Sequence, residues 1–271
     1  MAIPGIPQQR PTDYHVGLLA AVCAANACME AATPGSRIAK LITEFPITQR
    51  CRKTGEYLFR AGADFHFFYV LNAGFAKTCY VSEDGREQTT GFYLRGDILG
   101  LDAIATGTYS CDAVALDACE VLAIPYDGVI THSLRNPDLL RELHLAFSSE
   151  IRSEKDRMLS LRNLRAEGRV ATFLLEMSQR FGARGFSATD LQLHLTRLEI
   201  GSLLGLKLET VSRTFSHFAK LGLITVCLRK IVLIDRDGLL DIIAQLAGLE
   251  RDKKKLTDLG PIRLLRKNID T

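Results

Sequence analysis

The sequence predicts an α+β chain: an antiparallel β-roll of the jelly-roll kind, a long helix, and a smaller region of helices and short strands. Three observations lead to this expectation. Short runs of aromatic and β-branched residues alternate with glycine turns between residues 54 and 125, a spacing typical of antiparallel barrels. An apolar stripe at helical spacing follows over residues 136–162. Two helices separated by a glycine turn, and then two short strands, are indicated between residues 197 and 234.

The composition is that of a globular protein, with 271 residues of which 47% are hydrophobic and 24% are charged. No apolar run reaches the ~18 residues of a membrane-spanning helix. The longest candidate, residues 16–29, is too short, and no basic cluster precedes it as in a secretory signal. We therefore expect a cytoplasmic protein without a membrane partner. The seven cysteines are odd in number, so structural disulfides are not expected.

The net charge of +3 conceals an asymmetry along the chain. Residues 1–164 contain 16 Lys and Arg against 19 Asp and Glu, whereas residues 165–271 contain 18 against 12. A basic C-terminal part suggests that an anionic partner binds there. The alternative is a basic tail without such a role, because seven of these cations follow Glu250.

The β-roll is expected over residues 51–135, after an N-terminal helical or irregular segment of residues 1–50. Its predicted strands lie in the runs EYLFRAG, FHFFYVLNAG, FAKTCYVSEDG, REQTTGFYLRGD and CEVLAIP. Glu83, Asp84 and Gly85 should form a hairpin turn between the third and fourth runs, because glycine adopts a positive φ without steric cost.

A single long helix is expected over residues 136–163. Proline is tolerated in the first turn of a helix, and Asn136-Pro137 stands at its start. About 25 residues at 1.5 Å each give about 37 Å, so the helix would bridge domains or pair with its own copy. The stripe that would form a dimer seam comprises Leu143, Phe147, Ile151 and Met158, interrupted by Glu154. The alternative is a helix packed entirely on its own barrel.

Glu154 would face its own copy across a dimer seam. Two neighbouring carboxylates repel, so one should have a raised pKa or find a cation, and Lys155 and Arg157 are close in sequence. On this interpretation Glu154 keeps dimerisation marginal, so that a signal can change it. In the alternative, the helix is rotated and Glu154 lies at a solvated edge.

Residues 164–248 are expected to form a DNA-binding domain. A helix from Arg197 to Leu204, a turn through Gly205 and a second helix from Leu208 to Lys220 make a helix-turn-helix. Its apolar positions face the domain: Ile200, Leu203, Leu204, Leu206, Val211, Phe215 and Phe218. The face left free holds Glu209, Ser212 and Arg213. Arginine can bind guanine through two hydrogen bonds, glutamate can accept one from cytosine, and serine can meet several bases.

Two short strands within residues 224–234 would form a wing with Arg229 and Lys230 at its tip. These cations, with Arg197 and His217, are the expected contacts to DNA phosphates. A short strand over residues 191–196 precedes the two helices, a helix over residues 238–246 follows the wing, and residues 249–271 form a basic tail. The alternative is an ordinary helical corner whose polar face is simply solvated.

This arrangement resembles the CRP–FNR family of bacterial transcription regulators, and its FNR branch most closely, over residues 54–248. The resemblance rests on TGEYLFRAGADFHFFYVLNAG, EDGREQTTGFYLRGDILGLDAI and RFGARGFSATDLQLHLTRLEIGSLLGLKLETVSR. It implies a β-roll sensor domain like those that bind cyclic nucleotides, a dimerisation helix and a winged helix-turn-helix.

The resemblance also implies a function. A homodimer would bind double-stranded DNA at an inverted repeat of TTGAT-like half-sites, read by Glu209, Ser212 and Arg213. The loop with Asp84, Gly85 and Arg86 would contact RNA polymerase. Such a protein is a regulator, often an activator, and not an enzyme. No nucleophile–base pair, metal motif or phosphate loop appears in the sequence.

A first departure from the family concerns cyclic nucleotides. Members that bind cyclic AMP use an arginine to neutralise the phosphate. The matching segment here, GDILGLDAIATGTYSCDAVAL, contains neither arginine nor lysine. Burying a phosphate without a cation is unfavourable, so we expect no cyclic nucleotide.

A second departure concerns the 4Fe–4S cluster of oxygen-sensing members. Their ligands are an N-terminal run of three cysteines and a fourth in the barrel, where this chain has Leu122. Cys23, Cys28, Cys111 and Cys119 are the candidate ligands that remain, since thiolates hold such clusters. The alternative, which we favour, is that these are small buried hydrophobic residues. A thiol switch, or haem held by His15 or another histidine, has no motif behind it.

The signal therefore stays open between two hypotheses. In the first, the regulator responds to oxygen, redox state or a related signal. In the second, it holds no cluster, and its activity follows its own abundance or an unidentified ligand.

Overall fold

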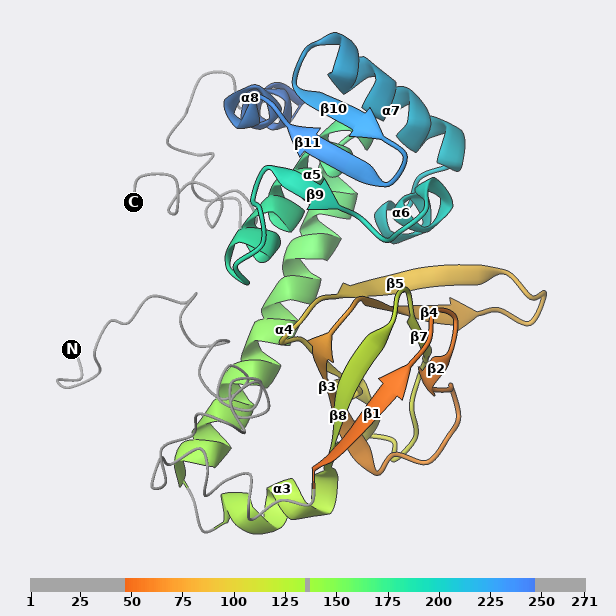
Figure 1. The fold of residues 1–271 in the computed structure, drawn as a ribbon, viewed down its shortest axis with the longest axis vertical. Helices are drawn as coiled ribbons and strands as arrows, with labels where there is room; N and C mark the ends of the chain where they lie inside the picture. The colour runs from red at the N-terminus through yellow and green to blue at the C-terminus, as the bar shows by residue number, and fades with distance from the viewer. Residues whose placement is uncertain (1–46, 135–136, 247–271) are drawn as a thin grey trace, which may run out of the picture. The chain divides into compact units, whose positions relative to one another are not determined.

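The computed structural model describes residues 47–134 and 137–246, without some side chains in the first half of the long helix (Figure 1). Within it the chain forms two compact units. Of the described residues, unit 1 comprises those up to Val81 and those within Phe92–Glu150, and unit 2 comprises Ser82–Gly91 and those from Ile151 onward. None of the described helices is long and apolar enough to cross a membrane.

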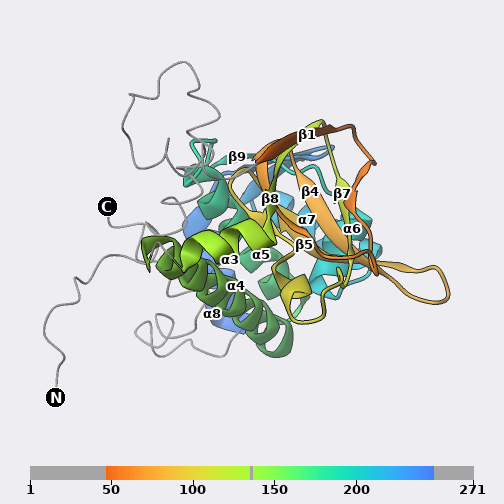
Figure 2. The same cartoon turned by 90° about the horizontal axis from the view of Figure 1, so that it is seen from below.

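The antiparallel roll that the glycine-punctuated runs predict is present, and all of its strands except most of β5 belong to unit 1. Two four-stranded sheets have the orders β1-β8-β3-β6 and β2-β7-β4-β5 (Figures 1 and 2). The strands are β1 (Thr48–Arg52), β2 (Tyr57–Phe59), β3 (Phe67–Ala73), β4 (Ala76–Val81), β5 (Glu87–Tyr93), β6 (Ile98–Leu99), β7 (Asp112–Ala115) and β8 (Cys119–Pro125). The sequence runs predicted β2, β3, β4, β5 and β8. They did not predict β1, β6 and β7. These strands are short or polar, and their extended conformation depends on pairing with neighbouring strands.

The interior of the roll is a continuous apolar core. Aromatic side chains dominate one part of it, where Phe59 stacks on Tyr109 with ring centroids 4.0 Å apart and planes 14° apart. Phe65, Phe68 and Tyr69 belong to the same buried cluster. Aromatic rings bury large apolar areas and gain from such ring contacts, so this cluster is a main source of the roll's stability.

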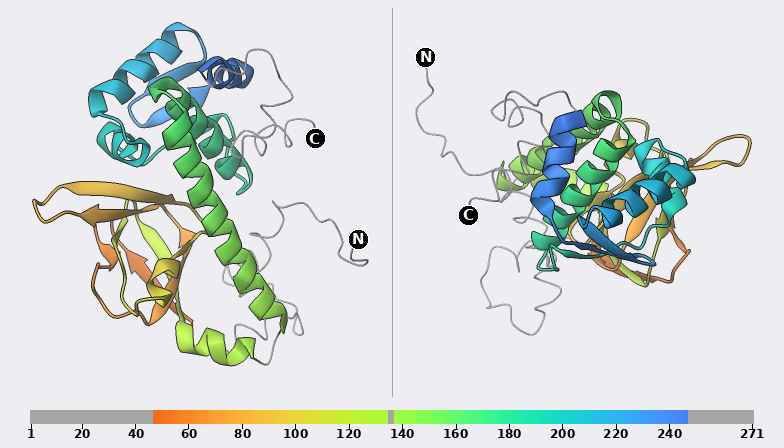
Figure 3. Two further views of the ribbon diagram at one scale, coloured as in Figure 1. Left: turned by 180° about the vertical axis from the view of Figure 1, so that it is seen from behind. Right: turned by 90° about the horizontal axis from the view of Figure 1, so that it is seen from above.

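Two helices follow the roll, namely α3 (Tyr126–Ser133) and α4 (Pro137–Asn163). The long helix has the predicted length and runs without a break (Figure 3). Phe147 packs against the core of the roll, so this predicted seam residue is used within its own unit. Ile151 and Met158 are 57% and 51% exposed. The side chain of Leu143 lies outside the described part of the structure.

Unit 2 is built from helices around a small sheet. Its further elements are α5 (Ala166–Gly182), β9 (Asp190–Gln192), α6 (Arg197–Leu204), α7 (Leu208–Lys220), β10 (Ile224–Cys227), β11 (Lys230–Leu233) and α8 (Arg236–Leu246). The sheet has the antiparallel order β10-β11-β9. Helix α5 packs against α7 and α8 (Figure 3).

The limits of α6 and α7 confirm the sequence prediction. Two other elements differ from it. Strand β9 begins and ends earlier than the predicted residues 191–196. Helix α8 begins two residues before the predicted start, because Asp235 Oδ1 accepts a hydrogen bond from the Gly238 backbone N–H at 2.9 Å and caps the first turn.

Candidate nucleic-acid interface

The first helix of the helix-turn-helix begins at a reciprocal cap. The Thr196 hydroxyl accepts a hydrogen bond from the Glu199 backbone N–H at 3.2 Å, and Glu199 Oε2 accepts one from the Thr196 N–H at 2.7 Å. This capping box satisfies two backbone donors that a helix start leaves without partners. The Thr-x-x-Glu spacing is visible in the sequence, and it explains why α6 starts at Arg197.

Two glycines shape the turn between α6 and α7. Gly205 ends α6 with φ +62°, in the left-handed region, where glycine is the usual residue at a helix C-terminus. Gly201 lies one turn earlier, and a Cβ there would be 2.6 Å from the Leu206 carbonyl oxygen. Its own carbonyl accepts a hydrogen bond from the Leu206 N–H at 2.8 Å. The turn can therefore fold back closely on α6 only because residue 201 has no side chain.

Helix α7 divides cleanly into a buried and a free face. Its buried positions are Val211, Thr214, Phe215 and Phe218. The opposite face brings together the predicted base-reading residues, with Glu209 and Arg213 exposed and Ser212 half-buried. The helical period alone explains this result, because positions three and four apart share a face.

Two more residues of α7 belong with this face. Ser216 is exposed, and its hydroxyl donates to the Ser212 carbonyl at 3.0 Å. The sequence analysis missed Ser216, although its spacing of four from Ser212 and three from Arg213 would have revealed it. His217 is also exposed, and its Nε2 lies 3.9 Å from Glu167 Oε1 of α5.

The wing differs in one respect from the prediction. Cys227 pairs with Lys230 in the β10–β11 ladder, so the tip consists of Leu228 and Arg229, not of Arg229 and Lys230. Leu228 has φ +54°, an uncommon conformation for a non-glycine residue, and its side chain is 89% exposed. Lys230 belongs to the strand because β11 also pairs with β9.

The predicted phosphate-contacting cations have partners within unit 2. Lys230 Nζ lies 2.7 Å from Asp190 Oδ2, and Arg229 Nη1 donates to the His194 carbonyl at 3.3 Å. These contacts hold the two side chains beside β9. About half of the Lys230 side chain stays exposed, so a phosphate could still approach its ammonium group.

Arg197 makes contacts within unit 2 that the sequence did not predict. Its guanidinium carbon lies 4.1 Å from the centre of the Phe215 ring, a cation–π contact, and Nη2 donates to the Leu228 carbonyl at 3.4 Å. Burial lowers the pKa of this group. Within the described residues, Nη1 is buried without a hydrogen-bond partner. Arg197 thus connects α6, α7 and the wing, and its phosphate contact stays a prediction.

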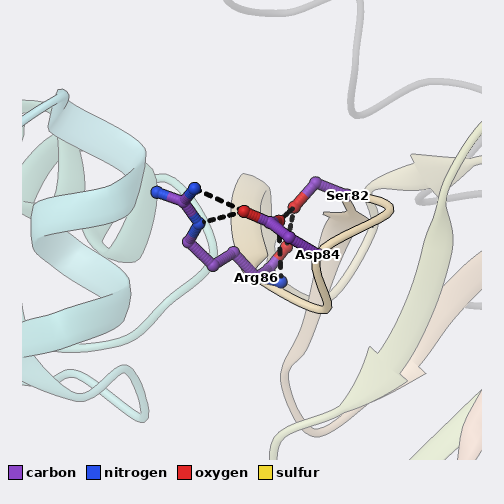
Figure 4. Close-up of polar contacts among 3 residues, drawn as sticks. All are labelled: Ser82, Asp84 and Arg86. Atoms are coloured by element: carbon purple, nitrogen blue, oxygen red, sulfur yellow. Dashed lines mark hydrogen bonds and ion pairs between the residues drawn. The ribbon is translucent and has the colours of Figure 1, made fainter.

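The loop predicted to meet RNA polymerase joins β4 and β5. Asp84 accepts hydrogen bonds from the Ser82 hydroxyl and from Arg86, whose Nε lies 2.6 Å from Asp84 Oδ2 (Figure 4). The Arg86 hydrogen bond, followed by that of Ser82, lowers the pKa of Asp84. Gly85 has φ +77° and donates to the Ser82 carbonyl at 2.8 Å. The loop therefore presents an ordered pair of opposite charges.

The segment on which the expectation of no cyclic nucleotide rests lies in the aromatic part of the roll. The segment from Gly96 to Leu116 contains no cation, and Tyr109, at its centre, is stacked on Phe59. The Tyr109 hydroxyl donates to the Phe67 carbonyl at 2.8 Å, and burial raises the pKa of this phenol. The absence of a cyclic nucleotide therefore stays a prediction that rests on this segment without cations.

The described thiols do not form a donor set for an iron–sulfur cluster. Burial, and then the charge of Asp102, raise the pKa of Cys111 to about 11. Cys119 is buried, and its Sγ lies 2.9 Å from the Phe75 carbonyl oxygen that accepts its hydrogen bond. Among the residues that the structure covers, no three His, Cys, Asp or Glu gather to hold a metal. Cys23 and Cys28 lie outside the described residues.

Comparison with known proteins agrees with this geometry. Residues 49–131 match the family model of the cyclic nucleotide-binding domain, and residues 168–242 match that of the Crp-like helix-turn-helix domain. The chain is 41% identical over 183 residues to the transcriptional activator protein anr of Pseudomonas aeruginosa, covering 68% of this chain and 75% of that protein.

Two further relatives extend the comparison. The fumarate and nitrate reduction regulatory protein of Escherichia coli is 38% identical over 198 residues, covering 73% of this chain and 78% of that protein. The solved structure of FixK2 from Bradyrhizobium japonicum has a TM-score of 0.66 at 30% identity, covering 72% of this chain and 96% of that one.

Proposed function

Because the chain belongs to the CRP–FNR family of transcription regulators and carries that family's DNA-binding helix-turn-helix, we propose that it reads an inverted repeat as a homodimer. The observation that carries this proposal is the free face of α7. Glu209 and Arg213 are exposed on it, while the opposite side of the same helix is buried. A helix held in this way can enter the major groove with its polar face toward the bases.

We assign the base contacts to Glu209, Ser212 and Arg213, and the half-site to a TTGAT-like sequence. Arginine would bind guanine O6 and N7 with two hydrogen bonds, and glutamate would accept from the cytosine amino group. A half-site with a central guanine in one strand and its paired cytosine in the other offers both partners. The wing cations and His217 would meet the phosphates.

The homodimer is supported by the long helix. Ile151 and Met158 lie two turns apart on α4 and are both more than half exposed, which is costly for large apolar side chains in water. A two-fold copy of the helix would cover them. A two-fold protein then requires two half-sites related by the same symmetry, which is an inverted repeat.

For the signal, the named functions of the relatives support oxygen or redox control. The relatives include an "anaerobic regulatory protein" from Haemophilus influenzae and the fumarate and nitrate reduction regulators. A specific observation favours the second hypothesis of a cluster-less regulator controlled by its abundance or another ligand. Cys119 is buried and Cys111 is half-buried, and burial raises the pKa of both thiols. Visible absorption of anaerobically purified protein separates the two, because a cluster absorbs broadly and buried thiols do not.

The DNA-binding proposal is tested by Arg213→Ala. Fluorescence anisotropy should show that the variant loses about 1–3 kcal/mol of binding free energy on a duplex with the inverted repeat. Its preference for the correct base at one position of the half-site should also weaken. A shuffled duplex of the same length and composition is the control, and the wild type should bind it much more weakly. Equal losses on both duplexes would mean that Arg213 contacts only phosphate.

A further inference from the structure

One arginine of α5 joins the ends of two other helices. Arg169 donates from Nη2 to the Leu161 carbonyl at 2.6 Å and from Nε to the Leu164 carbonyl at 2.9 Å. Both acceptors lie at the C-terminal end of α4. Its third nitrogen, Nη1, lies 3.2 Å from the carbonyl oxygen of Leu204 and 3.5 Å from that of Gly205. These two acceptors lie at the C-terminal end of α6. All the residues of this network belong to unit 2.

The chemistry of these acceptors explains why an arginine suits the position. The last carbonyls of a helix have no partner within it and carry partial negative charge. A guanidinium offers five N–H donors in a rigid plane and is always charged. Arg169 can therefore satisfy two helix ends at once, and the charge strengthens each hydrogen bond. A lysine, with one ammonium group, could not occupy both sets of acceptors.

The four acceptor carbonyls belong to two elements with different proposed roles, the dimerisation helix and the turn before the base-reading helix. Leu161 and Leu164 end the helix that carries the exposed residues Ile151 and Met158. Leu204 and Gly205 begin the turn that leads into α7, which starts at Leu208. Arg169 thus links the end of the proposed dimerisation helix to the turn before the base-reading helix, within one side chain's reach.

We propose that Arg169 is a positioning residue that fixes the angle between the end of α4 and the helix-turn-helix, and thereby sets the half-site spacing that the dimer accepts. This inference rests on the proposed function, because it needs a dimer that reads two half-sites. Those half-sites lie about one helical turn of DNA apart, or a multiple of it. Each inserted base pair moves one half-site by about 3.4 Å along the DNA axis and rotates it about that axis. If Arg169 holds the helix-turn-helix rigidly on α4, the dimer should bind a site of the wrong spacing more weakly.

The test compares Arg169→Met with Arg165→Met in the full-length protein. Arg165 is exposed and precedes α5, so its variant loses the same charge without breaking the network. Affinities are measured for the inverted repeat and for the same duplex with one base pair inserted between the half-sites. In the wild type and in Arg165→Met, the insertion should weaken binding strongly. In Arg169→Met we expect the ratio of the two affinities, inverted repeat over inserted duplex, to fall by about fivefold or more. A change of this size is typical of mutations that alter the coupling between two distant sites.

A purely structural role would give a different pattern. Loss of folded protein would reduce affinity for both duplexes by the same factor, and an unchanged ratio of the two affinities would overturn the proposal. Thermal unfolding followed by circular dichroism shows whether Arg169→Met folds. Arg169→Lys, which keeps the charge but not the planar fork, should lie between the wild type and Arg169→Met.

A second measurement needs no DNA. The amides of Gly205 and Leu206 donate to Ser202 and Gly201 within the turn. In Arg169→Met their hydrogen exchange should accelerate, while exchange in α8 stays unchanged. Unchanged exchange at the turn would overturn the inference. If instead the wild type failed to distinguish the inverted repeat from a shuffled duplex, the proposed function would fail, even with accelerated exchange at the turn.

Discussion

A single missing side chain controls how closely the two helices of the helix-turn-helix approach. A Cβ at Gly201 would lie 2.6 Å from the Leu206 carbonyl oxygen, and backbone atoms cannot move away as the end of a flexible side chain can. The tight turn is therefore a requirement on residue 201 that secondary-structure propensity does not show, because glycine inside a helix is otherwise unfavourable.

We predict that Gly201→Ala destabilises the DNA-binding domain by about 1–3 kcal/mol, the usual cost of overpacking a close contact. Urea unfolding of the variant and the wild type measures this cost. Lys220→Ala, at an exposed position near the end of α7, is the control and should change stability little. A Gly201→Ala variant as stable as the wild type would show that the turn can relax.

The thiol of Cys111 offers a test by pH. Its pKa of about 11, against an ordinary value of 9.0, reflects burial and the charge of Asp102. Because the folded value is the higher one, the protonated thiol stabilises the fold fully below pH 9, and this contribution is lost as pH rises through about 11. We expect the free energy of unfolding to fall less between pH 9 and about pH 11 in Cys111→Ala than in the wild type.

Reactivity provides a second measure of the same thiol. At pH 8, iodoacetamide should modify the exposed Cys51 and Cys227 well before Cys111, because the thiolate is the nucleophile. Mass spectrometry of the modified peptides follows each site. Rapid modification of Cys111 in the folded protein would show that its environment favours the thiolate, and would reopen its assignment as a metal or redox ligand.

At the scale of elements, the β4–β5 loop and the wing show how short hairpins present charge. In the loop, Asp84 and Arg86 pair with each other and Gly85 makes the turn. In the wing, the cations lie beside β9 through Asp190 and His194. Both hairpins therefore hold their charged side chains in defined places, as a docking surface requires.

The loop prediction concerns transcription and not DNA affinity. Changing Asp84 and Arg86 together to alanine should reduce activation in a purified transcription assay, while affinity for the inverted repeat stays unchanged, because a polymerase contact acts after DNA binding. Ser82→Ala is the matched variant, since it removes one hydrogen bond to Asp84 and leaves both charges. A parallel fall in DNA affinity would assign the loop a structural role instead.

At the scale of the whole molecule, the charges on α4 affect how tightly the proposed dimer is held together. Glu154 is exposed and lies 3.3 Å from Arg157, one turn along the same helix. Such exposed pairs contribute little to stability. The cation expected from the sequence is therefore present on the same chain, and it offsets part of the repulsion that two copies of Glu154 would experience.

We expect Glu154→Ala to tighten the dimer and to make DNA binding less dependent on the signal, because the variant removes two carboxylates from the seam. Sedimentation of the wild type and the variant at matched concentrations measures the dimer constant. Arg157→Ala should have the opposite effect, since it leaves Glu154 without its partner. An unchanged constant in both variants would place this pair at the solvated edge of the helix, away from the contact.

The local pattern of the sequence determined the elements that depend on neighbours in the chain. The limits of α6 and α7 follow from a helical period, a glycine turn and the Thr196–Glu199 cap, all within a few residues. The free face with Glu209 and Arg213 follows from the same period. The roll's longer strands follow in the same way from alternating runs between glycines.

Tertiary structure decided what depends on partners far along the chain. Arg197 stacks on Phe215, Lys230 pairs with Asp190, and Phe147 packs against the roll. The short strands β1 and β7 are defined by pairing with β8 and β4. Arg169 connects two helix ends that lie 40 and more residues apart. Long-range contacts such as these arise only when the chain folds, because a local pattern shows which face of an element is apolar and not which element will cover it.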